Sequence, residues 1–151
     1  MYANILMSTD GSDVARKGVK QGLALAKALN AKATVITVTE PLAVDYGGGF
    51  DSGWIPSKEE SDRFYAACKE SAEKVLDEAR AMAEQIGISV ELLHVPDAWH
   101  PATAIIETAK SRGCDLIVMA SHGRRGLRKL LLGSQTSEVL ADGSVPVLVV
   151  W

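Results

Sequence analysis

The chain has 151 residues, the size of one domain, and its 47% hydrophobic and 23% charged residues are typical of a globular protein rather than a disordered one. No apolar run approaches the roughly 20 residues that span a bilayer, and the first residues lack the basic segment of a signal peptide. We therefore expect a soluble, cytoplasmic protein without a membrane partner, and the net charge of −3 argues against nucleic acid as a partner.

The first predicted elements are a strand, a helix and a second strand. Residues 4–8 form a short apolar run that ends at a turn, which is typical of a strand buried on both faces. Ser12 stands at an N-cap position, and the Ala- and Leu-rich residues 14–30 predict a helix. Residues 33–39 are rich in β-branched side chains and predict a strand. Two glycines inside the helix indicate close packing on the sheet: Gly18 and Gly22.

A loop and a long helix are predicted next. Residues 42–56 are rich in glycine and lack periodicity, so they predict a loop. Ser57 and Glu60 have the spacing of a capping box. The helix that follows is expected to end at Gly87. Its apolar residues recur at helical spacing and predict a buried stripe of Phe64, Cys68, Val75, Leu76, Ala79, Met82 and Ile86.

The last third of the chain continues the alternation of strands and helices. A third strand is predicted over 89–95 and a helix from Pro101, which suits a first helical position, to about 113. The wholly apolar centre of the fourth strand, 115–120, indicates burial on both faces. A short helix over 134–141 and a strand over 145–150 complete the chain.

This order of elements predicts an α/β fold. Strands that alternate with helices pair in parallel through right-handed crossovers, with helices on both faces of the sheet. We expect one domain over residues 1–151, with an open, doubly wound, Rossmann-like sheet of five strands in the order 3-2-1-4-5. Ligands of such sheets bind beyond the carboxyl ends of the strands, at the point where the strand order reverses.

Two loops are expected to meet at that point, residues 9–12 after the first strand and 121–126 after the fourth. Glycine admits a close approach of the backbone to an anion, and a helix N-terminus favours negative charge. Between residues 121 and 134 there are four cations and no acid: Arg124, Arg125, Arg128 and Lys129. Neither the P-loop nor the dinucleotide glycine motif is present. On these residues alone, an ordinary turn with an N-cap, a solvated cationic face and a helix-capping Asp10 are open alternatives.

Cysteine and histidine offer no chemistry of their own in this sequence. Cys68 and Cys114 lie far apart and are expected to be reduced thiols. The three histidines show no ligand spacing with either cysteine, so no metal site is predicted from side chains. No Ser-His-Asp or Cys-His arrangement is indicated by order or spacing, so no catalytic residue is predicted.

The chain resembles the universal stress protein family over essentially its whole length, including residues 5–12 and the break after Val38. The segments that match the family signature are DLIVMASHGRRGL at 115–127, LLGS at 131–134 and VPVLVV at 145–150. Members that bind ATP carry G-x-x-G, nine residues and then G-[ST]. Gly123, Gly133 and Ser134 match this pattern, whereas Ala120 replaces its first glycine. The resemblance implies the fold of the adenine-nucleotide α-hydrolases and a site for ATP or AMP, with Mg²⁺ accompanying a triphosphate.

Carried over position by position, the resemblance implies that Asp10 contacts the ribose or adenine, that the backbone of Val38 pairs with the adenine edge, and that residues 133–136 close on the phosphates. The implied binding residues are Thr9, Asp10, Val38, Met119, Ala120, Ser121, His122, Gly123, Arg124, Arg125, Gly126, Gly133, Ser134, Gln135 and Thr136.

The resemblance also implies a stress-response protein that forms a homodimer through its last strand, Val147 to Trp151, with protein partners that are unknown. Its apolar edge would otherwise favour aggregation. At most slow ATP hydrolysis is expected. The alternative is a member that binds no nucleotide and serves as a dimerisation or interaction module, which the alanine at position 120 favours.

Overall fold

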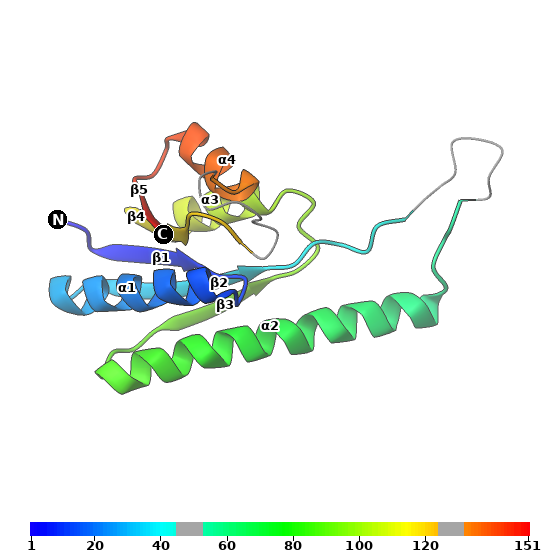
Figure 1. Ribbon diagram of the computed structural model, residues 1–151, viewed down its shortest axis with the longest axis horizontal. Helices are drawn as coiled ribbons and strands as arrows, with labels where there is room; N and C mark the ends of the chain where they lie inside the picture. The colour runs from blue at the N-terminus through cyan, green and yellow to red at the C-terminus, as the bar shows by residue number, and fades with distance from the viewer. Residues whose placement is uncertain (45–52, 124–131) are drawn as a thin grey trace.

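The computed structural model describes residues 1–44, 53–123 and 132–151, which form one parallel sheet between two layers of helices (Figure 1). Its strand order is β3-β2-β1-β4-β5, and every neighbouring pair is parallel. The predicted fold class and strand order are confirmed. The strands are β1 (Asn4–Ser8), β2 (Lys32–Val38), β3 (Glu91–Val95), β4 (Leu116–Ala120) and β5 (Val147–Val150).

The helices form two layers, as Figure 1 shows. Two of them, α1 (Asp13–Leu29) and α2 (Lys58–Ile86), cover one face of the sheet, and α3 (Pro101–Ser111) and α4 (Ser134–Asp142) cover the other. Side chains from alternate strand positions separate into two cores, as expected for a sheet buried on both faces. None of the helices in the described ranges is both long and apolar enough to cross a membrane.

Local capping chemistry fixes the helix ends where the sequence predicts them. The Ser12 side chain accepts a hydrogen bond from the N–H of Ala15, and Ser57 and Glu60 form both bonds of the capping box. Gly87 ends α2 in the left-handed conformation, with φ of 72°. Asn30, which we expected inside the first helix, is instead its left-handed cap, with φ of 53°.

The edge strands are shorter than predicted. Strand β5 begins at Val147 rather than at residue 145, because Pro146 has no N–H to donate to a ladder. The Pro146 carbonyl still accepts a bond from the N–H of Ile117, at 2.9 Å. Strand β3 begins at Glu91, opposite Thr34, rather than at residue 89.

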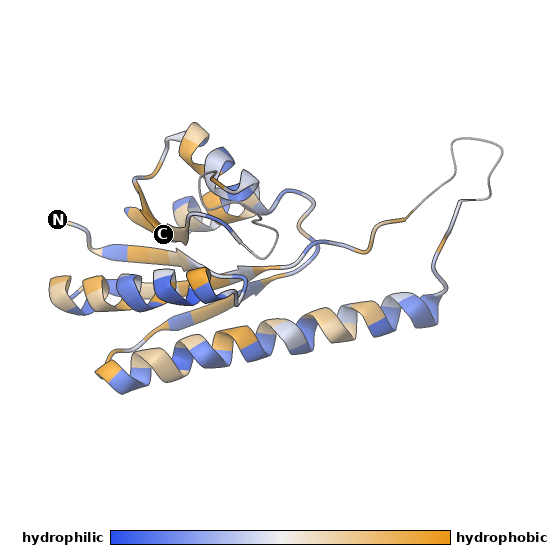
Figure 2. Ribbon diagram, viewed as in Figure 1, coloured by the Kyte–Doolittle hydropathy of each residue, from blue (hydrophilic) through white to orange (hydrophobic). Residues whose placement is uncertain are grey.

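The predicted apolar stripe of α2 is buried only in its second half. The first buried residue of the helix is Ala72, and Phe64 and Cys68 are half-buried. The first half of α2 extends beyond the sheet (Figure 1), so its apolar residues have no strand beneath them. Apolar and polar residues nevertheless alternate along its whole length (Figure 2). The Phe64 ring packs edge-on against Tyr65, with ring centroids 5.3 Å apart.

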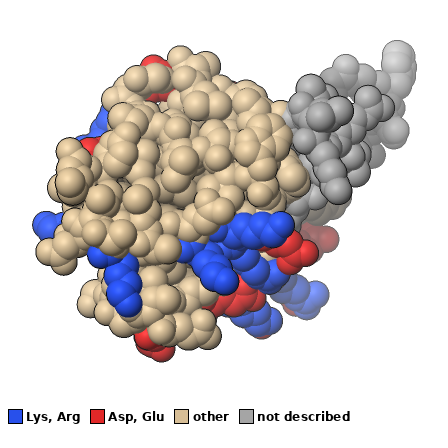
Figure 3. All heavy atoms as spheres, turned by 60° about the vertical axis from the view of Figure 1, so that its left-hand side comes forward, with Lys and Arg blue, Asp and Glu red and all other residues tan. Residues whose placement is uncertain are grey.

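Charged side chains are unevenly distributed over the surface. Residues 132–151, which form α4 and β5, contain no Lys or Arg and only two acids, Glu138 and Asp142. In Figure 3 the upper part of the face carries few charges, and Lys and Arg gather in its lower part, toward α1 and α2. The C-terminal strand and helix therefore present a nearly uncharged surface.

The carboxylate of Asp115 fixes the start of β1 against the start of β4. It accepts bonds from the N–H of Ala3 at 2.8 Å and of Asn4 at 3.0 Å, and these bonds lower the pKa of Asp115. A lowered pKa in the folded state stabilises the fold above the ordinary carboxyl pKa, and this contribution is lost as the pH falls through the lowered value.

We expect Asp115→Asn to reduce the free energy of unfolding at neutral pH by about 1 kcal/mol, because an amide oxygen is a weaker acceptor than a carboxylate. Urea unfolding of both proteins between neutral pH and about pH 3 measures the difference. The gap between the two proteins should narrow on acidification, and a gap that is the same at every pH would contradict the ionic role of Asp115.

Candidate functional site

The loops after β1 and β4 meet at the carboxyl edge of the sheet. Strands β1 and β4 are neighbours, with Met7 opposite Val118, so their loops leave the sheet side by side. A side-chain carbon added to Gly123 would lie 2.5 Å from Oδ2 of Asp10. The two loops that the sequence places in one crevice are therefore in direct contact, and glycine is what allows the contact.

Asp10 organises the first of these loops. Its Oδ1 accepts a bond from the N–H of Ser12 at 2.9 Å, while the Ser12 hydroxyl caps α1. The helix-capping alternative for Asp10 therefore falls to Ser12, and Asp10 turns its second oxygen toward Gly123. Thr9 is buried beneath this turn, and its hydroxyl accepts the N–H of Gly11 at 3.2 Å.

Hydrogen bonds hold the N-terminus of α4 at the end of β4. The N–H of Gly133 donates to the carbonyl of Ser121 and the Thr136 hydroxyl donates to the carbonyl of Ala120, both at 2.7 Å. Ser121 is fully buried, and its own N–H donates to Val150 of β5. This network aligns the first turn of α4 with the crevice.

The first turn of α4 offers donors to a ligand. Its N-cap is Gly133, which has no side chain with which to cap the helix, and the first N–H groups of a helix have no partner within it. Among the described residues, those of Ser134, Gln135 and Thr136 have no backbone partner, which suits them to bind an anion, and the helix dipole also favours one. Oε1 of Gln135 is buried without a hydrogen-bond partner in the described part of the chain, which adds one acceptor for a donor group.

Ala120, which departs from the family pattern, directs its methyl group away from α4. It is 8% exposed and packs with Val14 and Ala15 in the first turn of α1. The neighbouring Met119 belongs to the other face, with α3 and α4. The extra carbon therefore fills space beneath α1.

We expect Ala120→Gly to change the affinity for adenine nucleotide by no more than about twofold, which is well under 1 kcal/mol. The same change should reduce the free energy of unfolding by about 1 kcal/mol, through lost packing and the greater backbone entropy of glycine. Calorimetric titration and urea unfolding measure the two quantities. An affinity that rises tenfold or so would mean that the alanine obstructs the ligand after all.

The carboxyl end of β2 lies beside that of β1, on the side away from β4. Val38 is the last residue of β2, and the N–H of Thr39 donates to the carbonyl of Val95 at 3.0 Å. The Thr39 hydroxyl lies 2.8 Å from Nε2 of His94, and burial lowers the pKa of His94. The loop after β3 crosses here, because the N–H of Ala98 donates to the carbonyl of Thr39 at 3.1 Å. Sequence analysis did not single out Thr39, although the order 3-2-1 already makes β3 the neighbour of β2.

Three of the predicted site residues fall in the range 124–131, which the structure does not describe. Arg124, Arg125 and Gly126, with the other two cations of their loop, lie outside the described residues. His122 follows Ser121, and its Nδ1 lies 3.0 Å from the Ser121 hydroxyl. Over the described ranges, no group of three His, Cys, Asp or Glu side chains has the arrangement of a metal site.

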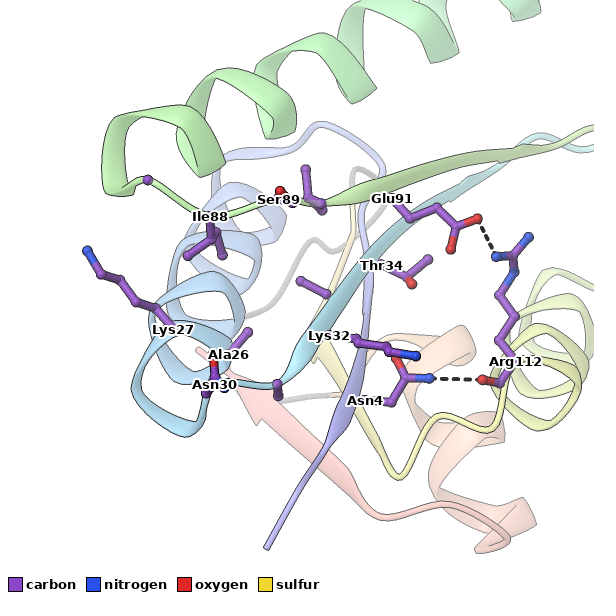
Figure 4. Close-up of a pocket in the computed structure, with 14 residues that line it drawn as sticks. Asn4, Ala26, Lys27, Asn30, Lys32, Thr34, Ile88, Ser89, Glu91 and Arg112 are labelled. Carbon is purple, nitrogen blue, oxygen red and sulfur yellow. Dashed lines mark hydrogen bonds and ion pairs between the residues drawn. The ribbon is translucent and has the colours of Figure 1, made fainter.

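A hollow lies at the amino-terminal edge of the sheet, opposite to the loops after β1 and β4 (Figure 4). Its volume is about 930 Å³, and it contains none of the predicted site residues. Lys27 donates to the carbonyl of Ile86 at 2.6 Å, and Arg112 is paired with Glu91. Since two of its three cations are already bound within the protein, this hollow offers little free positive charge to an anion.

Comparison with known proteins agrees with the fold. Residues 1–150 match the universal stress protein family. A universal stress protein of Thermus aquaticus is 35% identical over 153 residues, which cover 99% of each chain. The solved structure of the protein MJ0577 of Methanocaldococcus jannaschii superposes with a TM-score of 0.77 at 25% identity, over 99% of this chain and 96% of that one. A universal stress protein in complex with cAMP superposes with a TM-score of 0.70 at 28% identity, over 99% and 97%.

Proposed function

Because the chain belongs to the universal stress protein family, we propose that it binds an adenine nucleotide, ATP or AMP, in the crevice between the loops after β1 and β4. The observation that carries this proposal is the pair of close backbone approaches at Gly123 and Gly133. A side chain at Gly123 would meet Asp10 of the loop after β1, and one at Gly133 would meet the backbone of the loop after β4. The solved complex of a relative with cAMP supports an adenine nucleotide as the ligand class.

The bound nucleotide would extend across the end of the sheet. The phosphates lie at the first turn of α4, where the N–H groups of residues 134–136 face them. The base lies toward Val38 and Thr39 at the end of β2, and the ribose lies near Asp10. Arg124 and Arg125, which lie outside the described residues, directly follow Gly123 in the sequence and would add positive charge near the phosphates. A divalent cation accompanying ATP would be held through the phosphate oxygens.

The protein would act by binding rather than by catalysis, with its occupancy passed on to protein partners in a stress response. His122 directly precedes Gly123 in the sequence, and its Nδ1 is hydrogen-bonded to the Ser121 hydroxyl. A histidine so placed serves as a donor or spacer rather than as a free base. ATP turnover at or above about 1 s⁻¹ would contradict a binding role.

The first experiment is to identify the ligand that the purified protein carries. The protein is denatured, and released nucleotide is identified by chromatography and mass spectrometry. We expect an adenine nucleotide in near-stoichiometric amount, or a saturable calorimetric signal and thermal shift on adding ATP with Mg²⁺ or AMP. A protein that is empty and silent in all three assays would overturn nucleotide binding and favour the interaction-module alternative.

We further propose a homodimer formed through β5. This strand is an edge of the sheet, and two apolar side chains are exposed there, Leu148 within the strand at 38% and Trp151 directly after it at 61%. The lack of Lys and Arg over residues 132–151 leaves it without the charges that usually protect such an edge. A second copy of the strand supplies matching backbone groups and a matching apolar surface.

We expect Leu148→Lys to convert this dimer into a monomer, because association through β5 would bury a lysine from each copy at an apolar contact. Sedimentation equilibrium or light scattering of the wild type and the variant measures the mass. Thr103→Lys, at an exposed position of α3, is a matched control that adds the same charge elsewhere and should leave the dimer intact. A wild type that stays monomeric at micromolar concentration would contradict the dimer.

A further inference from the structure

The loop after β3 places a tryptophan beside the end of β2. The bond from the N–H of Ala98 to the carbonyl of Thr39 ties this loop to the residue after Val38. Trp99 follows Ala98 directly, so its Cα lies within about 4 Å of that of Ala98. Asp97, two residues before Trp99, has a left-handed conformation, with φ of 56°, which is typical of a turn. Trp99 therefore stands at the side of the crevice where the base is expected.

The Trp99 side chain does not pack into the core of the described protein. It is 69% exposed, and it makes no ring contact or hydrogen bond with the described residues. An indole combines a large apolar surface with a polar N–H, and such rings are enriched where proteins make contact with partners. By contrast, the backbone beneath the loop is well fixed, since Thr39 is bonded to Val95, His94 and Ala98. A fixed loop that carries an exposed ring is suited to present that ring to a ligand.

The position of Trp99 favours contact with the base rather than with the phosphates. Strands β2 and β4 lie on either side of β1, which separates their ends by about 10 Å. The phosphate donors of α4 are attached to β4 through Ser121 and Ala120. A nucleotide whose phosphates lie there directs its base toward β2, and hence toward Trp99.

We propose that Trp99 stacks on the base of the bound nucleotide and is a specificity-determining residue of the site. The inference rests on the proposed function, because it needs a nucleotide in the crevice. The flat face of an indole matches the flat face of a purine, and removing one such aromatic weakens binding by about 5- to 150-fold. Stacking selects for an extended aromatic base, which phosphate contacts alone do not do.

Calorimetric titration with AMP and ATP tests the proposal on three substitutions at Trp99. We expect Trp99→Ala to lose affinity by about 5- to 150-fold and Trp99→Phe to remain within about threefold of the wild type, since it keeps a ring. Trp99→Leu keeps apolar bulk without a ring face and should resemble the alanine variant. Wild-type affinity in Trp99→Ala, or equal rescue by leucine and phenylalanine, would overturn stacking.

Fluorescence provides an independent readout. The chain contains three tryptophans, and stacking on a base should quench the emission of Trp99 as AMP saturates the site. This quenching should persist in Trp54→Phe, a matched control at an exposed tryptophan, and disappear in Trp99→Phe. Quenching that persists in Trp99→Phe would overturn the inference while leaving nucleotide binding intact. A wild type that binds no nucleotide would instead overturn the proposed function, and the inference with it.

Discussion

Replacing Gly133 with alanine is expected to weaken adenine-nucleotide binding by about tenfold or more, which is about 1.4 kcal/mol of binding free energy. The added carbon would lie 3.2 Å from Cα of His122 and 3.6 Å from the carbonyl oxygen of Ser121. Both are backbone atoms, which cannot rotate away as the end of a side chain can. The N-terminus of α4 must then move from the end of β4, and its N–H groups lose their alignment with the phosphates. Calorimetric titration with ATP and AMP measures the loss.

A second glycine serves as the control for this substitution. Gly87 ends α2 with φ of 72°, and no atom lies within 4 Å of the carbon that alanine would add. It belongs to the lining of the hollow at the opposite edge of the sheet. Gly87→Ala should therefore cost about 1 kcal/mol of stability through its backbone conformation and leave the affinity unchanged. If Gly133→Ala folds normally and keeps wild-type affinity, the phosphates do not bind at α4.

Gly123 tests the same crevice from its other wall. Here an added carbon would meet a side-chain oxygen, Oδ2 of Asp10, at 2.5 Å. That side chain has limited freedom to move, because its other oxygen is bonded to Ser12. We expect Gly123→Ala to weaken binding as well and the double variant with Gly133→Ala to abolish it. If both substitutions deform one shared site, the loss of binding free energy in the double variant should differ from the sum of the two single losses.

Features that depend on local chemistry could be predicted from the sequence. The caps at Ser12, Ser57 and Gly87 each involve only a few neighbouring residues, so a short stretch of sequence is enough to predict them. The alternation of strands and helices predicts parallel pairing, and with it the meeting of the loops that contain Asp10 and Gly123.

Features that depend on contacts between distant segments could not be predicted in this way. The stripe of α2 reads as buried from Phe64 onward, yet the sheet ends before its first half is covered. The methyl group of Ala120 points toward α1 because side chains alternate between the two faces of β4 and α1 covers this face. The glycine pattern of the family gives no information about either feature. The bond between Ala98 and Thr39 joins segments 59 residues apart; the predicted strand order places the loop after β3 near the end of β2, but only the structure shows this bond.

The chain offers a stability test in which one helix contains both the variant and its control. Gly22 lies in α1 above β1, and an added carbon would lie 2.5 Å from Cγ and 2.6 Å from Sδ of Met7, which is fully buried. Gly18, one turn earlier, would place the same carbon 3.6 Å from the nearest atom, an ordinary contact with the backbone of Ala120. Both substitutions gain the same helix propensity, up to about 1 kcal/mol.

We therefore expect Gly18→Ala to be neutral or stabilising and Gly22→Ala to be less stable than it by about 1–3 kcal/mol, the usual cost of overpacking. Urea unfolding of the two variants measures this difference directly, because propensity cancels between them. Shortening Met7 to alanine removes the atoms that clash, so the double variant with Gly22→Ala should be more stable than the sum of the two single changes predicts. Equal stability of the two glycine variants would mean that Met7 repacks at no cost, and close contact between α1 and β1 would then not explain the glycine at position 22.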